Sequence, residues 1–213
     1  VWHSDEPFAD QYALPTYLLS KMARDHGTVV LSGDGGDELF AGYDRYVIHQ
    51  ARNTYNRIPE FARRQGLRRV STALPHSSFG KNFLYNISLD PIDRYIDSIS
   101  TFNLPRKRRL YSSDMLASLN GSRSAGEMLF AGFAETPQGS DPLARLLYLD
   151  SKTYLPGDIL TKVDRMTMAN SLEARVPLLD HEVIELAAGM ASHLKLKGGQ
   201  TKYILKKAMA KLV

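Results

Sequence analysis

The segment from residue 28 to residue 43, TVVLSGDGGDELFAGY, constrains the fold of this chain more than any other. An apolar, β-branched run stops at Ser32, and three glycines and three acidic residues follow before an amphipathic segment begins. This order predicts a buried strand at 28–31, a tight loop and the start of a helix near Asp37. In open α/β sheets, ligands bind at the carboxyl ends of strands, and glycines let the backbone approach them closely. The segment therefore predicts a ligand-binding edge of a parallel sheet, with helix-start N–H groups that attract phosphate.

Three familiar motifs do not fit this loop. A Walker A loop needs a lysine where Asp37 stands, a dinucleotide fingerprint needs a glycine where Glu38 stands, and Gly36 breaks the alternating acids of an EF-hand loop. An acid-rich, glycine-rich loop without a lysine remains, and its carboxylates suit Mg²⁺ bound beside phosphates. The alternative is a glycine turn in which Asp34 or Asp37 caps the helix.

The composition is that of an ordinary globular protein. With 213 residues the chain is long enough for one sizeable domain, and 43 % of them are hydrophobic. No cysteine is present, which excludes disulfides and cysteine-bound zinc and fits a cytoplasmic protein. The net charge of +4 is concentrated in residues 45–69 and 106–109, where aromatic residues do not alternate with the arginines. We therefore interpret these basic runs as solvated helix faces rather than a nucleic-acid site.

Most of the remaining chain has helical spacing. The pattern predicts helices at 15–26, 37–58, 61–74, 92–101, 112–119, 127–134, 142–154, 157–171, 181–190 and 202–213. Asp141 and Asp180 are suitable N-caps, and residues 172–180 read as extended because Pro177 disfavours a helix before it. A single clear strand among so many helices is unusual for a complete α/β domain. We therefore expect the other strands of the sheet to precede Val1.

Five blocks of the sequence, in order, carry a family resemblance. They are DEPFAD at 5–10, the segment 28–43, YLPGD at 154–158, SLEARVPLLD at 171–180 and KGGQTKYILKKA at 197–208. Together they resemble the synthetase domain of glutamine-hydrolysing asparagine synthetases, whereas the middle of the chain matches only loosely. The resemblance implies an α/β fold, of which this chain is a truncated, mostly helical part of an adenine-nucleotide α-hydrolase-like parallel-sheet domain.

The resemblance also implies a domain organisation. Residues 1–213 correspond to the C-terminal portion of the synthetase domain. The family's pyrophosphate-binding S-G-G-x-D-S loop and its glutaminase domain are expected before Val1. Because half of the phosphate site would then be missing, we expect this piece alone to have no ligase activity.

The reaction that the resemblance implies is adenylation of a carboxylate by ATP, followed by attack of ammonia derived from glutamine. Aspartate would give asparagine, AMP and pyrophosphate. The resemblance assigns ATP binding to Ser32, Gly33, Asp34 and Gly35, and Mg²⁺ binding to Asp37. The implied partners are small molecules, with no nucleic acid and no membrane, and the resemblance allows a homodimer.

Asp34 departs from the family pattern. Asparagine synthetases usually carry glutamate at this position, beside the acyl-adenylate, so the shorter side chain leaves the acceptor open. A related amidotransferase with another acceptor, or an amide-forming cyclase, remains an alternative. A helical binding module without catalysis is the alternative of another class.

Lys162 and Arg165 lie three residues apart and so share a helix face. The resemblance implies a catalytic cation in this helix, at one position or the other, and we favour Lys162. The alternative is a pair of surface cations near Asp164. Glu173 and Arg175 alternate on an extended segment, so we expect a buried ion pair behind the site. Such a pair would be structural rather than chemical.

Overall fold

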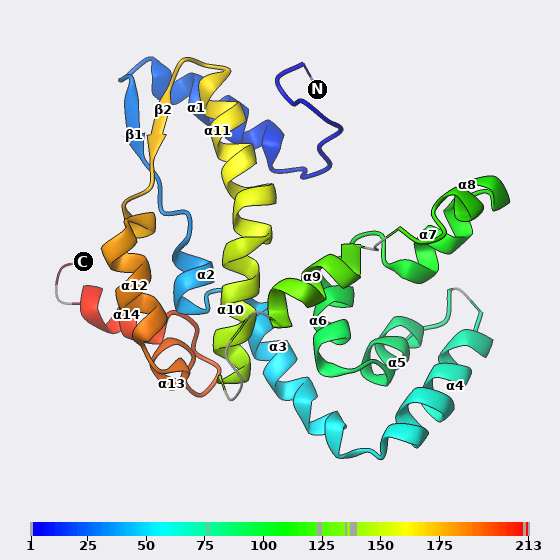
Figure 1. The fold of residues 1–213 in the computed structure, drawn as a ribbon. Coiled ribbons are helices and arrows are strands. Elements are labelled where there is room, and N and C mark those ends of the chain that lie inside the picture. Colours follow the sequence, from blue (N-terminus) through cyan, green and yellow to red (C-terminus); the bar gives the residue numbers. More distant parts are fainter. Residues whose placement is uncertain are drawn as a thin grey trace. The chain divides into compact units, whose positions relative to one another are not determined.

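The computed structural model consists mainly of helices and contains one two-stranded parallel sheet (Figure 1). It describes residues 2–75, 77–122, 125–134, 136, 140–210 and 212. The chain divides into two compact units, which we treat separately. Unit 1 comprises Val1–Tyr43 and Thr136–Val213, and unit 2 comprises Asp44–Glu135. No helix in the described ranges is both long and apolar enough to cross a membrane.

Unit 1 carries both strands and the predicted site residues. Its elements are α1 (Ala13–Arg24), β1 (Val29–Leu31), α2 (Gly36–Phe40), α10 (Pro142–Lys152), a π-helical turn (Leu155–Leu160), α11 (Thr161–Met168), β2 (Glu173–Arg175), a 3₁₀ turn (Pro177–Leu179), α12 (His181–Gly189), α13 (Ser192–Lys195) and α14 (Tyr203–Met209). The predicted caps are confirmed: Asp141 accepts from two N–H groups at the start of α10, and Asp180 from one at the start of α12. The predicted helix at 202–213 is confirmed over α14, and positions 211 and 213 lie outside the described residues.

The predicted strand is confirmed at 29–31, but the expectation that it is buried is wrong, because Val29 and Leu31 are 42 % and 75 % exposed. Its partner comes from the segment that was expected only to be extended. β1 pairs in parallel with β2, with Val30 opposite Ala174. The Ser32 N–H donates to the Arg175 carbonyl at 2.8 Å, so the carboxyl ends of both strands lie together. The mostly helical α/β character is therefore confirmed.

The expectation of a buried Glu173–Arg175 pair is wrong in one respect. The two side chains form an ion pair of 2.7 Å, but 55 % and 65 % of their areas are exposed. Alternate residues of both strands share one face of the sheet, and on that face Val29 and Leu31 are also exposed. The pair therefore contributes little to stability, because exposed ion pairs are screened by solvent.

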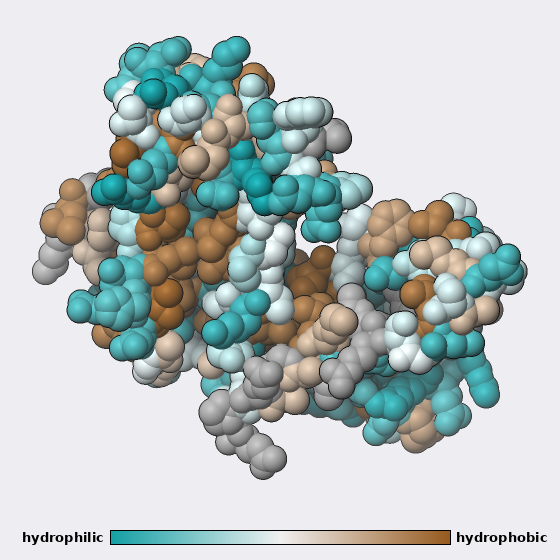
Figure 2. Space-filling model, turned by 45° about the horizontal axis from the view of Figure 1, so that its top comes forward, coloured by the Kyte–Doolittle hydropathy of each residue, from teal (hydrophilic) through white to brown (hydrophobic). Residues whose placement is uncertain are grey.

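Several large hydrophobic side chains of unit 1 lie at the surface. On α1 they are Leu14, Leu18, Leu19 and Met22, each exposed by 59 % or more. Figure 2 shows hydrophobic side chains at several places on the drawn face of the molecule, among hydrophilic ones. Such a set of exposed hydrophobic side chains on one helix is uncommon on isolated soluble domains.

The helix predicted at 37–58 is interrupted, which corrects that prediction. α2 ends at Phe40, Ala41 has a left-handed backbone with φ of 56°, and α3 (Asp44–Arg52) begins after the break. The Gly42 N–H donates to the Asp37 carbonyl at 2.8 Å, as at many helix C-termini. A Cβ at Gly42 would lie 1.9 Å from an Asp37 carboxylate oxygen, so the break requires a glycine at this position. A prediction from the helical spacing of apolar residues takes no account of that glycine.

A small hydrophobic core fixes the helix that follows the predicted ligand loop. Leu39 and Phe40 of α2 are buried together with Ala187 of α12. Leu179, Met190, Ile204 and Leu205 pack against them. The loop between β1 and α2 is therefore anchored at one end by the sheet and at the other by this core.

Gly35 should be the least replaceable glycine in this loop. Its φ is 80°, and an added Cβ would lie 2.2 Å from a methyl carbon of Leu179. We expect Gly35→Ala to lower the free energy of unfolding by at least about 1–2 kcal/mol, the usual cost of a left-handed alanine, and to lower Tm. Gly66→Ala is the matched control, because a Cβ there meets nothing within 4 Å. Equal Tm values for the two variants in thermal unfolding would contradict this assignment.

The described residues of unit 2 form helices and the turns that connect them, without a strand. After α3 it contains a 3₁₀ turn (Asn53–Arg57), a π-helical segment (Ala62–Leu67), α4 (Arg68–Ala73), α5 (Lys81–Ser88), α6 (Pro91–Ile99), α7 (Leu104–Leu110), α8 (Ser113–Ser118) and α9 (Ala125–Ala134). The helices predicted at 61–74, 92–101, 112–119 and 127–134 are confirmed, and α5 and α7 were not predicted. Asn103 caps α7 by accepting from the Arg106 N–H, with Pro105 in the first turn, a signal that the sequence did contain.

Arg94 holds the helices of unit 2 together. Arg94 is 1 % exposed, and its guanidinium donates to the carbonyls of Arg52 at 2.9 Å and of Leu89 at 3.0 Å. These bonds join α6 to the end of α3 and to the residue after α5. A buried guanidinium that binds only neutral oxygens leaves a positive field in this unit.

His49 gives unit 2 a pH-dependent stability. Burial, then Arg94 and Arg52, lower the pKa of His49 to about 4. The unfolded chain binds this proton below about pH 6.5, so the free energy of unfolding should fall as the pH falls from 6.5 to 4, by up to about 3 kcal/mol. His49→Gln, which cannot take up the proton, should show a flatter dependence of Tm on pH. The same slope in both proteins would show that His49 is not responsible.

Candidate functional site

The acidic loop, residues 32–37, begins at the carboxyl end of β1. The Ser32 hydroxyl donates to an Asp34 carboxylate oxygen at 2.5 Å, which closes the first part of the loop on itself. The space where a Gly33 Cβ would lie is open, with nothing within 4 Å. An incoming ligand can therefore approach the backbone at Gly33. Because α2 has only five residues, any attraction for phosphate must come mainly from the loop N–H groups rather than from the helix dipole.

Asp37 lies in the first turn of α2 and is paired with a lysine from the far end of the chain. One Asp37 carboxylate oxygen lies 3.0 Å from the Lys202 ammonium, and about a third of each side chain is exposed. Lys202 has a φ of 52° and its N–H donates to the Phe40 carbonyl at 3.2 Å. Sequence reasoning did not single out Lys202, although it lies in one of the blocks that carry the resemblance.

Glu38 points away from solvent and has its own partner. Its side chain is 1 % exposed and accepts a 2.6 Å hydrogen bond from the Tyr43 hydroxyl. Burial raises the pKa of the Glu38 carboxyl, and burial followed by the bond to Glu38 raises the pKa of Tyr43 well above its usual value. The Tyr43 ring meets the Tyr154 ring edge-on at 5.9 Å. Two resemblance blocks therefore meet here, and the Tyr43 ring, hydrogen-bonded to the buried Glu38 side chain, joins them.

Lys162 is buried in an ion pair with the N-terminal segment. Its ammonium lies 2.5 Å from an Asp10 carboxylate oxygen, and the two side chains are 10 % and 13 % exposed. The Tyr12 ring lies 5.7 Å from the same ammonium. The alternative of two surface cations is therefore wrong for Lys162.

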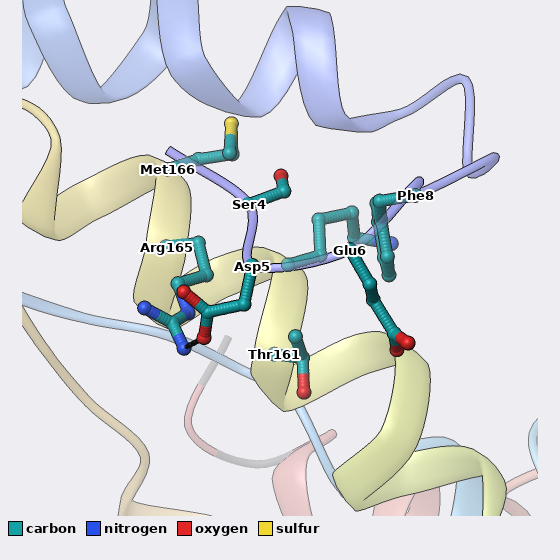
Figure 3. A pocket seen from close by; sticks show the side chains of 8 residues that line it. Ser4, Asp5, Glu6, Phe8, Thr161, Arg165 and Met166 are labelled. Carbon is teal, nitrogen blue, oxygen red and sulfur yellow. Dashed lines mark hydrogen bonds and ion pairs between the residues drawn. The ribbon is translucent and has the colours of Figure 1, made fainter. Parts of the chain in front are cut away.

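Arg165 is the more exposed member of the pair. It forms an ion pair with Asp5, in which the two side chains are 42 % and 76 % exposed. Figure 3 shows the Asp5 and Arg165 side chains pointing toward one another at the side of a pocket. This pocket of about 260 Å³ is lined by Ser4, Asp5, Glu6, Phe8, Thr161, Lys162, Arg165 and Met166. The structure thus brings the two predicted cations to one pocket, together with the DEPFAD block.

The predicted site residues fall into two groups. The ATP-binding and metal-binding candidates lie on the acidic loop between β1 and α2. The two cation candidates lie on α11 and bind carboxylates of the N-terminal segment. The roles of both groups stay predictions, because the contacts seen in the structure join these side chains to other residues of the protein and not to a substrate.

The donor set of unit 1 fits Mg²⁺ only together with a phosphate. In the ranges that the structure describes, no three His, Cys, Asp or Glu side chains are grouped to hold a metal ion. Mg²⁺ is usually held by one or two carboxylates and by substrate phosphates, so it needs no such cage. Asp37, partly exposed and beside an open loop, supplies one suitable carboxylate.

Comparisons with known proteins agree with the resemblance. The asparagine synthase family model matches residues 1–213. Asparagine synthetase [glutamine-hydrolyzing] 1 of Bacillus subtilis is 39 % identical over the whole chain, which covers 33 % of that protein. A putative asparagine synthetase of Mycobacterium bovis is 37 % identical over the whole chain, which covers 32 % of it. Amidase chyE of Penicillium rubens is 28 % identical over 98 % of the chain and 34 % of its own length.

The chain spans about a third of the length of the curated relatives that it matches. The match nevertheless extends over every residue of the chain, including the divergent middle that the sequence blocks left open. The parallel strand pair, the acidic loop and the buried Lys162 all lie inside the matched region. This chain therefore belongs to the asparagine synthase family.

Proposed function

We propose that the chain is part of an ATP-dependent amidotransferase that adenylates a carboxylate, most simply that of aspartate. Ammonia from glutamine then displaces AMP to give the amide, which is asparagine when aspartate is the acceptor, and pyrophosphate is released in the first step. The observation that carries the proposal is the acidic loop at the joined carboxyl ends of β1 and β2, in a chain that this family matches throughout. In parallel sheets this edge is where nucleotides bind.

The proposed role of the acidic loop is to bind ATP. Gly33 offers open backbone, and Gly35 holds the left-handed turn that directs the loop into α2. Ser32 and Asp34 would meet the AMP part and the activated carboxylate. Because Asp34 already accepts a bond from Ser32, substrate binding must exchange this contact for new ones.

The proposed role of Asp37 is to share in holding Mg²⁺ against the phosphates. A bound Mg²⁺ would offset phosphate charge while the pyrophosphate leaves. Lys202 would keep the carboxylate oriented, since its ammonium lies 3.0 Å from one oxygen. The negative charge of the Asp37 carboxylate would attract the Mg²⁺, which the neutral side chain of an asparagine at this position could not do.

The proposed role of Lys162 is to donate to the charge that develops at the α-phosphorus. A buried ammonium is a strong donor because few waters compete with it. In this structure Asp10 accepts from Lys162, so Asp10 also fixes the direction of the ammonium. Arg165, more exposed and paired with Asp5, would act as a secondary cation.

The remaining parts of the proposal concern the whole protein. We propose that residues 1–213 are the C-terminal portion of a synthetase domain with an adenine-nucleotide α-hydrolase-like sheet, in a cytoplasmic enzyme. Its substrates would be ATP, the acceptor carboxylate and glutamine, and a homodimer is compatible with it. The family match favours this ligase over a non-catalytic helical module.

Isotope transfer tests the adenylation step directly. When the intact protein is given aspartate labelled with ¹⁸O in its side-chain carboxylate, ATP, Mg²⁺ and ammonia, one labelled oxygen should appear in AMP. Glutamate, with one more methylene, is the matched control acceptor. Amide formation with the label in inorganic phosphate instead would overturn adenylation.

A second candidate acceptor is favoured by Asp34. Its side chain is drawn back to Ser32, within 2.5 Å, and so leaves more room beside the loop than an extended side chain would. One relative of similar coverage is named an amidase rather than an asparagine synthetase. Acceptor-dependent pyrophosphate release that occurs with a larger carboxylic acid but not with aspartate would establish this alternative.

A further inference from the structure

Unit 2 contains a second pocket, which shares no lining residue with the proposed site. Its volume is about 370 Å³, and it opens among α3, α5 and α6. Arg45, Arg52 and Arg94 line it, with Asp97 as the acidic member and His49 as a further titratable one. The names of the relatives mention no ligand that would be bound in this part of the chain.

The charged side chains that line this pocket are mostly cationic. They are three arginines and one aspartate, and His49 is neutral at pH 7 because burial, then Arg94 and Arg52, lower its pKa to about 4. Arg94 contributes a field rather than a contact, since its donors are directed to carbonyl and amide oxygens. The Asp97 carboxylate oxygens already accept from two asparagine side chains.

Arg52 can still meet a ligand. One of its terminal nitrogens donates to the Asn86 side chain at 2.7 Å, which orients the guanidinium, and the contacts of its side chain in the described residues involve no carboxylate. A planar guanidinium matches two oxygens of a phosphate or carboxylate. Arg45, two turns earlier in α3, lines the same pocket and donates through Nε to the Tyr95 hydroxyl at 3.1 Å.

The walls of the pocket are partly apolar. The Phe83 ring is 39 % exposed and lies 5.5 Å from the Arg52 guanidinium carbon, and Ile48 is 47 % exposed. A ligand that carries a ring or a short hydrocarbon could cover these side chains and gain free energy by removing their surface from water. Polar cations beside apolar walls are typical of sites for small organic anions.

We propose that this pocket binds the phosphate group of a small phosphate monoester, with the guanidinium of Arg52 on the phosphate oxygens and Phe83 against the organic part. A phosphate monoester carries a charge of about −1.5 to −2 at pH 7 and offers three acceptor oxygens to the guanidinium of Arg52. The proposal does not depend on the ligase function, because its residues all belong to unit 2.

Binding of phenyl phosphate to the intact protein, measured by isothermal titration calorimetry, tests the proposal. We expect a saturable site that Arg52→Gln weakens by about ten- to a hundredfold, the usual effect of losing a charge-assisted hydrogen bond. Arg69→Gln is the matched control: it removes the same charge from an exposed position of α4 outside the pocket. If both variants weaken binding equally, the effect comes from the net charge of the protein and not from a contact with Arg52, and the proposed site is wrong.

Two further ligands define its chemistry. Benzoate has the same ring with one negative charge and should bind at least about tenfold more weakly, so equal binding would overturn the phosphate assignment. Inorganic phosphate lacks the ring and should bind more weakly than phenyl phosphate in the wild type. Phe83→Ala should reduce that difference, and an unchanged difference would contradict the role of the apolar wall. This second variant decides the matter if Arg52→Gln does not fold.

The ATP site also attracts phosphate, so its contribution must be separated. Arg52→Gln separates the two sites, because Arg52 lines the pocket of unit 2 and is no part of the proposed synthetase site of unit 1. Normal binding of phenyl phosphate in Arg52→Gln would assign the ligand to another site and overturn the proposal.

Discussion

Lys162→Ala in the intact protein should lower kcat for pyrophosphate formation by about 10²–10³, with a near-normal KM for ATP. The expected loss is that of one preorganised donor to charge that develops in the transition state. KM should change little, because ground-state contacts to ATP are shared with the acidic loop. Arg165→Ala should have a smaller effect, since its ion pair with Asp5 is exposed and is therefore screened by solvent. Single-turnover rates with saturating ATP give the comparison.

The buried ion pair makes a stability control necessary. Removing Lys162 leaves the Asp10 carboxylate, which is 13 % exposed, without its cation, and breaking one partner of a buried pair commonly costs about 3–5 kcal/mol. Asp10→Asn removes the charge of the partner but keeps the lysine, so it should retain most of kcat at temperatures where the protein is folded. If Asp10→Asn and Lys162→Ala lower kcat equally, the ion pair has a structural role and Lys162 is not the catalytic cation. If Arg165→Ala lowers kcat more than Lys162→Ala does, the catalytic cation is Arg165, one helical turn away.

Asp37→Asn should have the second large effect, a fall of about a hundredfold or more in pyrophosphate release, while glutamine hydrolysis continues. Asparagine keeps the shape of the side chain but loses the charge that Mg²⁺ requires. Raising the Mg²⁺ concentration should restore part of the rate, because the phosphates still supply ligands. Rates measured over a Mg²⁺ titration test this.

Lys202 provides the matched comparison for Asp37. Lys202→Met breaks the same ion pair from the other side and leaves the carboxylate in place. Its Mg²⁺ requirement should not rise, whereas that of Asp37→Asn should. If the two variants show the same Mg²⁺ dependence, Asp37 acts by holding α14 and not by binding metal.

Local signals were read correctly from the sequence. The strand at 28–31, the caps at Asp141 and Asp180 and most helices depend on residues within a few positions of one another, and the structure confirms them. Apolar spacing and cap chemistry act at this range, which is why a pattern can identify them. The acidic loop was placed correctly at a strand end for the same reason.

Contacts between distant segments could not be read in this way. Asp10 and Lys162 are separated by 152 positions, and Asp37 meets Lys202 across most of the chain. The break after Phe40 follows from such contacts, since Gly42 leaves the room that the Asp37 carboxylate and Lys202 occupy. Helical spacing continued through this point, so the pattern predicted one helix where packing requires two.

The order of segments in unit 1 has a consequence for how the protein forms on the ribosome. β1 is complete by residue 31, but its partner β2 ends at residue 175, after the whole of unit 2 has been made. At bacterial or eukaryotic translation rates this interval lasts roughly ten to thirty seconds. Unit 2 is contiguous and can fold in that time, whereas β1 has to wait with an unpaired edge that other chains can join. The nascent chain is thus most in need of protection by chaperones between these two points, and the acidic loop gains its final shape only near the end of synthesis.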